Sequence, residues 1–532
     1  MNKGSLSRPT VLSPANPNSS DVLAERAMAL LAQGQASAAA DTLRRAITVR
    51  PAWVECFHKL GLLEFQFGRV GEALLLLRRA AIIEPNRAGI HADLGVILHL
   101  AGSLQDGLWH QRQAVILDPV PAMAYRNLAR SLLIADRPAE ALQVLAHAVR
   151  LDPGAPEIRN NIGNALKMLG RSAARDQYWA ALILHPAFAE AHNNLGALER
   201  DQGAAAVAVT LCDRALTVMP DYAEARLNRG LARLTLGDLR AGWADYEARW
   251  RVPGWPSPPP PFHQPRWDGL PLAGRTLLLQ AEQGLGDTLQ FIRYAPRLAA
   301  SDGRIALSVQ APLIPLLTNL PGCDVVVDMA GALPPFDCWL PLLSLPLVTG
   351  YVPEPAHIPY LTIAPERTAF WRRRLGPGPS VGLVWAGNPG NRNDRRRSCP
   401  LSRLEPLLAV AGVQWVSVQK GAAAADIAGL GWLDRMIDLD PEIRDFQDTG
   451  AILQTLDLLI TVDTAVAHLG GALGRPTWIM LGDASDWRWQ QDRRDSSWYP
   501  TARLFRQPTR GDWDSLVTEL VAELRSLVTG FR

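Results

Sequence analysis

The fold of the C-terminal half is decided by the stretch Val462–Thr477, which reads VDTAVAHLGGALGRPT. The apolar run Leu456–Thr461 before it is typical of a buried strand, and its own small residues are typical of a helix that stops at Gly474 ahead of Pro476. A turn from a strand into a helix directs free backbone N–H groups and the positive end of the helix dipole at one point, which suits a diphosphate. We therefore predict a nucleotide-diphosphate site at this edge of an α/β domain.

The side chains at the start of this helix supply the chemistry of the predicted site. Thr464 and His468 are four residues apart and therefore lie on one helical face, and Asp463 and Ala465 flank the turn. The residues alone leave two interpretations open. The first is a donor site, and the second is a helix in which Asp463 is the N-cap and His468 packs in the core.

The pattern Asp463-Thr464-Ala465-x-x-His468-Leu469 resembles the donor motif of heptosyltransferase-type glycosyltransferases, those of glycosyltransferase family 9. The resemblance implies a GT-B fold of two Rossmann-like lobes. It also implies an inverting reaction, in which an acceptor hydroxyl displaces a nucleotide diphosphate from a sugar. Asp463, Thr464 and Ala465 would then contact the nucleotide sugar, and His468 would be catalytic.

A second motif of the same family lies upstream, in the sequence EQGLGDTLQF of residues 282–291. It resembles the Gly-x-Gly-Asp loop, in which Gly284 and Gly286 would approach the donor and Asp287 would be the general base that takes the proton of the attacking hydroxyl. A structural interpretation stays open, because Asp287 and Gln290 have the spacing of a capping box. A helix N-terminus also weakens a carboxylate as a base.

An arginine-rich loop, residues 386–398 with the sequence AGNPGNRNDRRRS, directly follows the expected strand Ser380–Trp385. Glycines leave its backbone accessible and guanidinium groups match phosphate oxygens, so we expect the loop to neutralise the leaving diphosphate with no metal or other cofactor. The alternative is a solvated charge run, since three adjacent arginines cannot all face one site. The predicted donor contacts are Gly387, Asn388, Asn393, Arg395 and Arg397, with Gln419 and Lys420 at the end of another strand.

The N-terminal half is organised by prolines that recur every 34 residues, with one interval of 33: Pro51, Pro85, Pro119, Pro153, Pro186 and Pro220. Small residues such as Gly61, Gly95 and Gly196 recur in phase with them, where two antiparallel helices would approach closely. This period resembles the tetratricopeptide repeat, with six complete units to Pro220 and a seventh to Trp250. Stacked repeats leave a concave face, so we expect a protein partner there.

Four asparagines occupy one slot of the repeat, at intervals of 34, 33 and 34 residues: Asn127, Asn161, Asn194 and Asn228. Each amide offers donors and an acceptor, which would grip the backbone of an extended peptide without reading its sequence. We therefore expect a ladder that binds the partner. The alternative is that asparagine is simply common at this slot.

These signals divide the chain into a disordered tail (1–20), the repeat array (21–250), a proline-rich linker (251–274), an acceptor-side lobe (275–365) and a donor-side lobe (366–532). In the first lobe, strands are expected at 275–280, 305–309, 324–328 and 336–340, and a helix from Thr288 to about Ala299. The predicted fold class is therefore an α-solenoid followed by an α/β GT-B region. This order resembles that of bacterial tetratricopeptide-repeat glycosyltransferases.

Composition limits the classes of function. The 532 residues carry a formal net charge of +2, which gives no case for nucleic acid or an anionic membrane as a partner. The five cysteines are odd in number and widely spaced, so we expect reduced thiols and no zinc. No apolar run reaches the ~18 residues of a membrane span, and the polar start differs from a signal peptide. A cytoplasmic location is therefore expected.

The predicted function is the transfer of a sugar from a nucleotide-sugar donor to a hydroxyl of a protein that the repeats hold. Two alternatives stay open: a transferase acting on a glycan or a lipid-linked saccharide of the lipopolysaccharide type, and a repeat scaffold with an inactive transferase region. The first lobe is much shorter than in lipopolysaccharide heptosyltransferases, which argues against a conventional lipid-sugar acceptor site.

His468 provides the first test. As a donor contact it would stabilise charge on the leaving phosphate, so His468→Ala should cut turnover by roughly 100-fold or more while the protein stays folded. A core histidine would instead lower the melting temperature and leave activity per folded molecule unchanged. Melting temperature and single-turnover rate, measured on the same variant, separate the two outcomes.

Overall fold

The computed structural model describes residues 19–298, 302–350, 358–391 and 394–530. The chain separates into two compact units, Met1–Asn194 (unit 1) and Leu195–Arg532 (unit 2). The predicted tail of residues 1–20 lies outside the described residues, except for its last two. Of these, Ser19 caps the first helix, because its hydroxyl accepts a hydrogen bond from the Val22 N–H.

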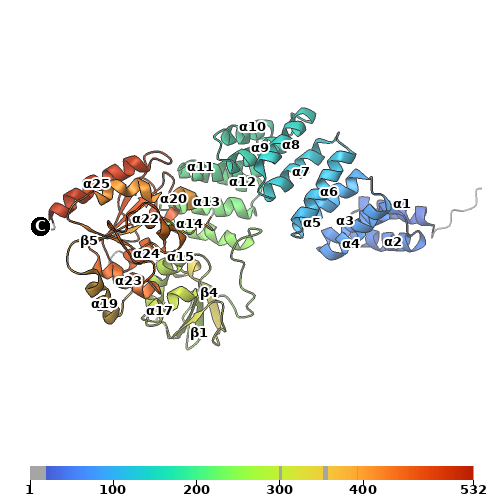
Figure 1. Ribbon diagram of the computed structural model, residues 1–532. Helices are drawn as coiled ribbons and strands as arrows, with labels where there is room; N and C mark the ends of the chain where they lie inside the picture. Colours follow the sequence, from blue (N-terminus) through green and yellow to red (C-terminus); the bar gives the residue numbers. More distant parts are fainter. Residues whose placement is uncertain (1–18, 299–301, 351–357, 392–393, 531–532) are drawn as a thin grey trace, which may run out of the picture. The chain divides into compact units, whose positions relative to one another are not determined.

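Unit 1 consists of antiparallel helix pairs that follow one another in sequence order (Figure 1). Each pair corresponds to one period of the sequence, which confirms the predicted α-solenoid. Gly61 illustrates the need for small residues, since a Cβ at this position would lie 2.8 Å from the Leu77 Cγ on the paired helix. The helices are α1 (Ser20–Ala32), α2 (Ala36–Val49), α3 (Val54–Gln66), α4 (Val70–Ile83), α5 (Ala88–Leu100), α6 (Leu104–Leu117), α7 (Ala122–Ile134), α8 (Pro138–Leu151), α9 (Pro156–Met168) and α10 (Ala174–Leu184).

The turn inside each repeat needs a residue in the left-handed backbone region. Gly34 and Gly68 adopt φ values of 74° and 77°, which cost a glycine no Cβ clash. In the fourth repeat Asp136 takes the same place with φ 56°. Aspartate tolerates this conformation better than most residues, so the repeat keeps its geometry where the glycine pattern is interrupted.

The last helices of the array belong to unit 2. The helix α11 (Ala189–Asp201) crosses the boundary, and α12 (Ala205–Val218), α13 (Ala223–Thr235) and α14 (Leu239–Tyr246) follow it. A 3-10 turn, Glu247–Arg251, then ends the helical array close to the predicted end at Trp250.

The first lobe contains a parallel four-stranded sheet of order β3-β2-β1-β4. All four strands lie within two residues of their predicted positions, because each is a short apolar run bounded by turn residues. The strands are β1 (Thr276–Gln280), β2 (Arg304–Val309), β3 (Val325–Asp328) and β4 (Cys338–Pro341), and the helices are α15 (Leu285–Phe291), α16 (Ala295–Leu298), α17 (Ile314–Leu317) and α18 (Leu345–Thr349).

The helix after β1 differs from the prediction, which placed its start at Thr288. It starts at Leu285, because Gly284 takes an extended N-cap conformation with φ −74° and ψ 167°. Asp287 is therefore the third residue of the helix and not its cap. The helix also breaks into a 3-10 turn after Phe291, where the prediction had one continuous element.

The second lobe contains a parallel six-stranded sheet of order β10-β9-β8-β5-β6-β7. Counted from β5 this order is 3-2-1-4-5-6, that of a doubly wound sheet, with its switch point between β5 and β8. The strands are β5 (Ser380–Val384), β6 (Gln414–Ser417), β7 (Ile437–Asp438), β8 (Leu458–Val462), β9 (Thr477–Leu481) and β10 (Ala502–Arg506). The main helices are α19 (Pro365–Leu375), α20 (Asp394–Arg397), α23 (Phe446–Thr455), α24 (Ala465–Ala472) and α25 (Trp513–Gly530).

The segment 251–274, predicted as a linker, has little regular structure but packs on the first lobe. The Trp267 N–H donates to the Trp339 carbonyl (2.9 Å), and the Trp339 N–H donates to the Pro265 carbonyl (3.2 Å). The segment thus forms a single parallel β-bridge with β4, between Arg266 and Trp339. Trp267 and Leu272 are both buried in the core of unit 2.

A buried ion network joins the seventh repeat to the first lobe. The fully buried Arg249 guanidinium donates to both carboxylate oxygens of Glu282 at 3.0 Å, and also to Glu247 (2.7 Å) and the Ser344 hydroxyl (2.8 Å). Glu282 lies two residues beyond the end of β1, so this network fixes the start of the segment that leads to Asp287. Replacing both charges by apolar groups costs little in such sites, but removing one leaves the other buried and unpaired.

An aromatic cluster joins the same repeat to both lobes. The Trp243 ring of α14 makes edge contacts with Phe291 of the first lobe (5.5 Å between centroids) and with Trp487 of the second (5.2 Å). Trp498 packs against Phe291 and Trp487 from the other side. Trp487 and Trp498 of the second lobe therefore pack elements of the two lobes together.

No helix among the described residues is both long enough and apolar enough to cross a membrane.

The ion network gives a prediction on stability. Arg249→Met strands the Glu282 carboxylate in the core, so we expect a loss of about 3–5 kcal/mol, and the double variant with Glu282→Leu should recover most of it. The exposed Arg251 offers a matched control, since Arg251→Met should stay within about 0.5 kcal/mol of the parent. Urea unfolding followed by tryptophan fluorescence measures these changes in the free energy of unfolding, because most tryptophans lie in unit 2. Equal effects at both arginines would contradict the prediction.

Candidate functional site

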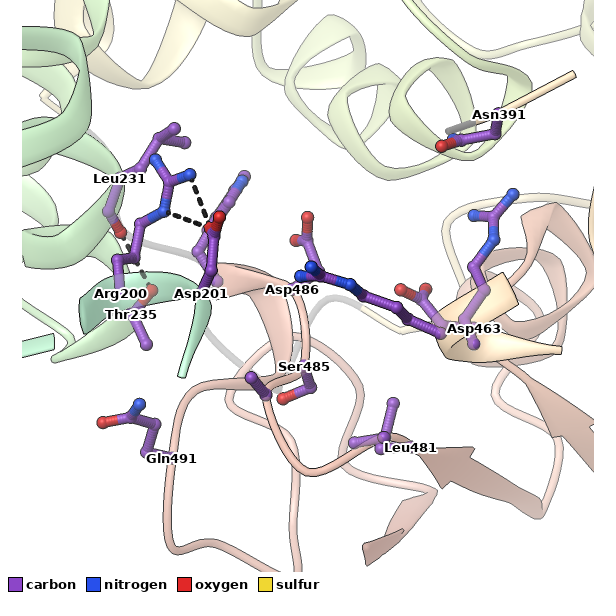
Figure 2. Close-up of a pocket in the computed structure, with 15 residues that line it drawn as sticks. Arg200, Asp201, Leu231, Thr235, Asn391, Asp463, Leu481, Ser485, Asp486 and Gln491 are labelled. Atoms are coloured by element: carbon purple, nitrogen blue, oxygen red, sulfur yellow. Dashed lines mark hydrogen bonds and ion pairs between the residues drawn. The ribbon is translucent and has the colours of Figure 1, made fainter. Parts of the chain in front are cut away.

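A pocket of about 270 Å³ opens at the carboxyl ends of the strands of the second sheet (Figure 2). Asp463 lines it directly after β8, Leu481 lines it at the end of β9, and Arg396 and Arg397 line it from α20, which follows β5. Ligands of open α/β sheets bind at this edge near the switch point between β5 and β8. The structure therefore brings the predicted Asp463 motif and the arginine loop together.

The opposite side of the pocket comes from the repeats. Arg200 and Asp201 of α11 and Leu231 and Thr235 of α13 line it. The Arg200 guanidinium is held in place, because it pairs with Asp201 (2.8 Å) and donates to the Asn228 amide oxygen (2.7 Å). None of these four pocket residues was predicted, since they follow no motif and lie more than 150 residues from the arginine loop.

The arginine loop is folded by its own polar groups. The Gly387 N–H donates to the Ser398 hydroxyl (2.9 Å), and Arg397 pairs with Asp394 (3.2 Å). A Cβ at Gly387 would lie 2.7 Å from an Arg397 guanidinium nitrogen, so a larger residue here would displace this arginine from its present position. Gly387 therefore shapes the loop without lining the pocket.

The structure changes which members of the loop face the pocket. Arg397 lines it as predicted, but its second arginine is Arg396, while Arg395 is exposed outside it. Asn388 accepts a hydrogen bond from the Gly390 N–H and does not line the pocket, whereas Asn391 does. Asn393 lies outside the described residues. Two of the three adjacent arginines thus line the pocket and the third does not, which agrees with the expectation that three could not all face one site.

Asp463 is a partly buried acid that lines this pocket. Burial raises the pKa of its carboxyl from 3.8 to about 6, and the Asp486 carboxylate adds to the rise. The Trp489 indole and the guanidinium groups of Arg397 and Arg488 oppose it. Asp463 therefore keeps its proton to a higher pH than a free aspartate does.

Asp463 is not the N-cap of α24, so the structural alternative for it is wrong. Thr464 is the N-cap, with φ −139° and ψ 174°, and its hydroxyl makes no capping bond but lies 3.3 Å from that of Thr461. Ala465 begins the helix and faces the first lobe, 3.6 Å from where a Gly286 Cβ would be. Neither Thr464 nor Ala465 lines the pocket.

His468 is packed between the lobes and does not line the pocket. It is 4% exposed, its Nδ1 lies 2.9 Å from the Tyr499 hydroxyl, and its ring stacks on Trp489. Burial lowers the pKa of the imidazole well below 6.5, and nearby arginines lower it further, so the ring is neutral. A charged imidazole is therefore disfavoured at this position, and the catalytic role of His468 stays a prediction.

Gly286 explains the close packing of the lobes around His468. A Cβ at Gly286 would lie 2.7 Å from the His468 Cδ2. The glycines of this motif thus serve the contact between α15 and α24 and the N-cap at Gly284, which is exposed. Neither glycine lines the pocket, so their predicted contact with a donor stays a prediction.

Asp287 has both carboxylate oxygens engaged. Oδ2 accepts the Gly284 N–H (2.7 Å), and Oδ1 pairs with the guanidinium of Arg488. The pKa of the carboxyl is raised, mainly by burial and also by Asp486, although Arg488 and the N–H bonds pull it down. Asp287 thus accepts the N–H of the N-cap residue Gly284, which has no side chain to complete a capping box, and Gln290 accepts from Arg488 (2.7 Å) instead of closing a box with Asp287.

Gln419 and Lys420 do not line the pocket, and their side chains bond to groups at the ends of the strands. The Gln419 Oε1 accepts the N–H groups of Trp385 (3.1 Å) and Ala386 (2.9 Å), and its Nε2 donates to the Ala386 carbonyl (3.1 Å). Lys420 pairs with Asp440 beyond β7 (3.1 Å). Gln419 therefore ties the ends of β5 and β6 together, and its side chain is committed to backbone groups.

The four asparagines of the ladder share one place in the repeat. Each is the sixth residue of the first helix of its repeat, in α7, α9, α11 and α13, and each is partly buried: Asn127, Asn161, Asn194 and Asn228. Asn194 donates to Asn160 (3.0 Å), and Asn228 accepts from Arg200. The side chains of Asn194 and Asn228 are thus already hydrogen-bonded to the preceding repeat.

Comparison with known proteins agrees with the helical half. Residues 24–88, 111–156 and 164–217 match the tetratricopeptide repeat family, so this is a repeat protein joined to a parallel α/β region. Protein FlbA of Caulobacter vibrioides (strain ATCC 19089 / CIP 103742 / CB 15) is 30% identical over 413 residues, 65% of this chain and 68% of that protein. The chain belongs to the same family as Protein FlbA.

Two solved structures are similar to part of the chain. A tetratricopeptide repeat protein from Parabacteroides merdae is 16% identical, with 43% of this chain and 91% of that chain covered and a TM-score of 0.40. PilF of Pseudomonas aeruginosa is 18% identical, with 39% and 95% covered and a TM-score of 0.34.

Asp463 gives a prediction on pH. Its folded-state pKa is raised from 3.8 to about 6, so the folded state binds the extra proton between these values. The stability from this group is fully present below pH 3.8 and is lost as the pH rises to about 6. The parent should therefore lose stability relative to Asp463→Asn across this window, measured as melting temperatures of both proteins from pH 4 to 7. A constant difference between them would contradict the prediction.

Proposed function

We propose that this protein is a glycosyltransferase of GT-B fold that moves a sugar from a nucleotide-diphosphate donor to a hydroxyl of a protein bound by its repeats. The observation that carries the proposal is the pocket at the switch point of the second sheet. There Arg396 and Arg397 meet Asp463 of the motif that resembles family 9 transferases. Two parallel α/β lobes packed through α15 and α24 are the arrangement that a GT-B fold requires.

The charges of the pocket suit a nucleotide sugar. Guanidinium groups of Arg396 and Arg397 match the diphosphate, and they would neutralise the charge that develops on it as it leaves. Carboxylates at Asp463, Asp486 and Asp201 are acceptors for sugar and ribose hydroxyls.

The proposed reaction is a single displacement. The acceptor oxygen forms the bond to the anomeric carbon, the bond from that carbon to the diphosphate oxygen breaks, and the acceptor proton passes to a base. Asp287 is the proposed base, and its raised pKa supports that role. Its Oδ1 must first part from Arg488, which would then be available to an anionic ligand.

The repeats have two tasks in this proposal. Their groove holds the acceptor protein, with the asparagine slot as its contact, and α11 and α13 supply part of the donor pocket. Shared use of one pocket by repeats and transferase lobe supports a protein acceptor over a glycan or lipid-linked saccharide. In the latter case the repeats would have no reason to reach the donor.

A binding scaffold is the second candidate. It is favoured by the engagement of both Asp287 oxygens and by the position of His468 away from the pocket. In that case a nucleotide sugar would still bind but no sugar would be transferred or hydrolysed.

Titration with uridine, guanosine and adenosine diphosphate sugars in a calorimeter tests the proposal, and turnover of the sugar that binds separates enzyme from scaffold. Arg396→Ala should weaken binding about 10-fold or more, since a charged hydrogen bond contributes about 1.5–3 kcal/mol. Arg395→Ala is the matched control, because this neighbour is exposed outside the pocket and should change nothing. EDTA should leave the affinity unchanged, because arginines and not a metal neutralise the diphosphate.

Two outcomes would contradict the proposal. If none of the nucleotide sugars binds, the pocket has another ligand and the transferase interpretation fails. If Arg395→Ala and Arg396→Ala weaken binding equally, the anion is attracted by the loop as a whole and not held in the pocket.

A further inference from the structure

Arg200 is the single cation among the four repeat residues that line the pocket at the second sheet (Figure 2). It is the twelfth residue of α11, and it lies on the wall opposite Arg396 and Arg397 of the second lobe. Its side chain is 23% exposed, so solvent reaches it. A ligand in the pocket therefore meets a guanidinium from the repeats as well as two from the arginine loop.

The Arg200 guanidinium is held in one orientation by its own repeat and the next. Its Nε and Nη2 donate to the Asp201 Oδ1 (3.3 and 2.8 Å), and its Nη1 donates to the Asn228 Oδ1 (2.7 Å). In the part of the chain that the structure describes, Arg200 makes no further hydrogen bond. Since an arginine carries five N–H groups, one on each terminal nitrogen is left for a ligand.

The small size of the pocket brings its two walls onto the same ligand group. Its volume of about 270 Å³ lies below the ~300–1,000 Å³ of typical drug-sized ligand sites. On the wall opposite Arg200, Arg396 is exposed and Arg397 pairs with Asp394 (3.2 Å). A group that fills so small a space contacts both walls, so one anionic group can meet Arg200 and Arg396 together.

A further cation, Arg506 at the end of β10, makes the surroundings of the pocket positive. It donates to the hydroxyl of the pocket residue Ser485 (2.6 Å) and to the carbonyls of Trp489 (2.7 Å) and Arg493 (3.3 Å). All three acceptors are neutral. Burial lowers the pKa of the Arg506 guanidinium from 12.5 to about 10, and the Asp492 carboxylate opposes this shift. A cation that is desolvated without an ion pair is stabilised by an anion nearby.

Three carboxylates also line the pocket, but each is already compensated. Asp201 pairs with Arg200, and Asp486 pairs with the buried Arg488 (2.8 Å). The raised pKa of Asp463 keeps its proton on the carboxyl to a higher pH than in a free aspartate. The acids therefore do not cancel the charge of the exposed Arg396, and the pocket favours an anion.

We propose that Arg200 is a phosphate contact of this pocket, and that one phosphate of the ligand bridges α11 of the repeats to α20 of the second lobe. A guanidinium that is already oriented presents N–H donors that match phosphate oxygens, and little of its freedom is lost on binding. That this phosphate belongs to a nucleotide diphosphate rests on the proposed function. The contact with Arg200 does not, because any ligand phosphate in this pocket meets the same two walls.

Calorimetric titration of the full chain with inorganic pyrophosphate tests the contact, because pyrophosphate has neither a base nor a sugar. We expect Arg200→Gln to weaken its binding about 10-fold or more through the loss of charged hydrogen bonds. This variant also leaves the Asp201 carboxylate without its arginine, and that carboxylate would repel the anion. The double variant with Asp201→Asn removes the repulsion, and its affinity should stay well below that of the parent.

Lys167 offers a matched control. It is the twelfth residue of α9, the place that Arg200 has in α11, and it does not line the pocket. Lys167→Gln removes the same charge from the preceding repeat, so the affinity for pyrophosphate should be unchanged. Melting temperatures of all variants establish that they are folded.

The bridge is tested by combining Arg200→Gln with Arg396→Ala. Two arginines on one phosphate are coupled, so the loss of affinity in the double variant should differ about twofold or more from the product of the two single losses. A product within error of the double variant would place the arginines on separate groups and overturn the bridge.

Four outcomes would overturn the contact with Arg200. They are no binding of pyrophosphate at millimolar concentration, parent affinity in Arg200→Gln, parent affinity restored by Asp201→Asn, and an equal loss in Lys167→Gln. Failure of the proposed function looks different. If pyrophosphate binding depends on Arg396 and not on Arg200, only this inference fails. If binding depends on both arginines and no nucleotide sugar binds, the phosphate contact stands and the transferase proposal fails.

Discussion

The position of the two lobes depends on one buried cation, Arg488. Its guanidinium joins Asp287 and Gln290 of the first lobe to Asp486 of its own loop, and it lies over the Trp487 ring at 4.2 Å. A charge that is 8% exposed persists only where each of its donors has an acceptor. The pocket loop of the second lobe and the first helix of the first lobe are therefore fixed relative to one another by the same side chain.

A second buried cation, Arg249, fixes the last repeats against the first lobe. Its bonds to Glu282 attach the end of the helical array to the loop after β1, and the aromatic contacts of Trp243 extend this attachment to the second lobe. The last repeats and both lobes thus form one packed body, unit 2. This explains how residues of α11 and α13 come to line a pocket whose floor belongs to the second sheet.

Local patterns in the sequence predicted most of the fold. Prolines and small residues repeat at a fixed interval because each repeat packs against the next in the same way, and β1, β5 and β8 are apolar because both their faces are buried. β10, with the sequence ARLFR, was missed because an edge strand carries arginines that pair with solvent-side acids such as Glu523. β7 has two residues and leaves no pattern.

The candidate site was predictable only where it follows a strand. Asp463 and Arg397 were found because residues after parallel strands converge at one edge of a sheet. Arg200 and Thr235 were not found, because their place in the pocket depends on how the repeats dock, which no local pattern encodes. His468 and Gln419 lie at the predicted edge of the sheet but do not line the pocket. The His468 Nδ1 contacts the Tyr499 hydroxyl, and the Gln419 side chain hydrogen-bonds to backbone groups.

The missing Cβ of Gly286 also sets how closely the lobes can approach. A Cβ at residue 286 would lie 2.7 Å from the His468 Cδ2, where α15 contacts α24. The imidazole stacks on Trp489 and has little room to move, so a larger residue at position 286 would push α15 away from α24. The spacing of the two lobes at this contact therefore depends on the absence of a side chain.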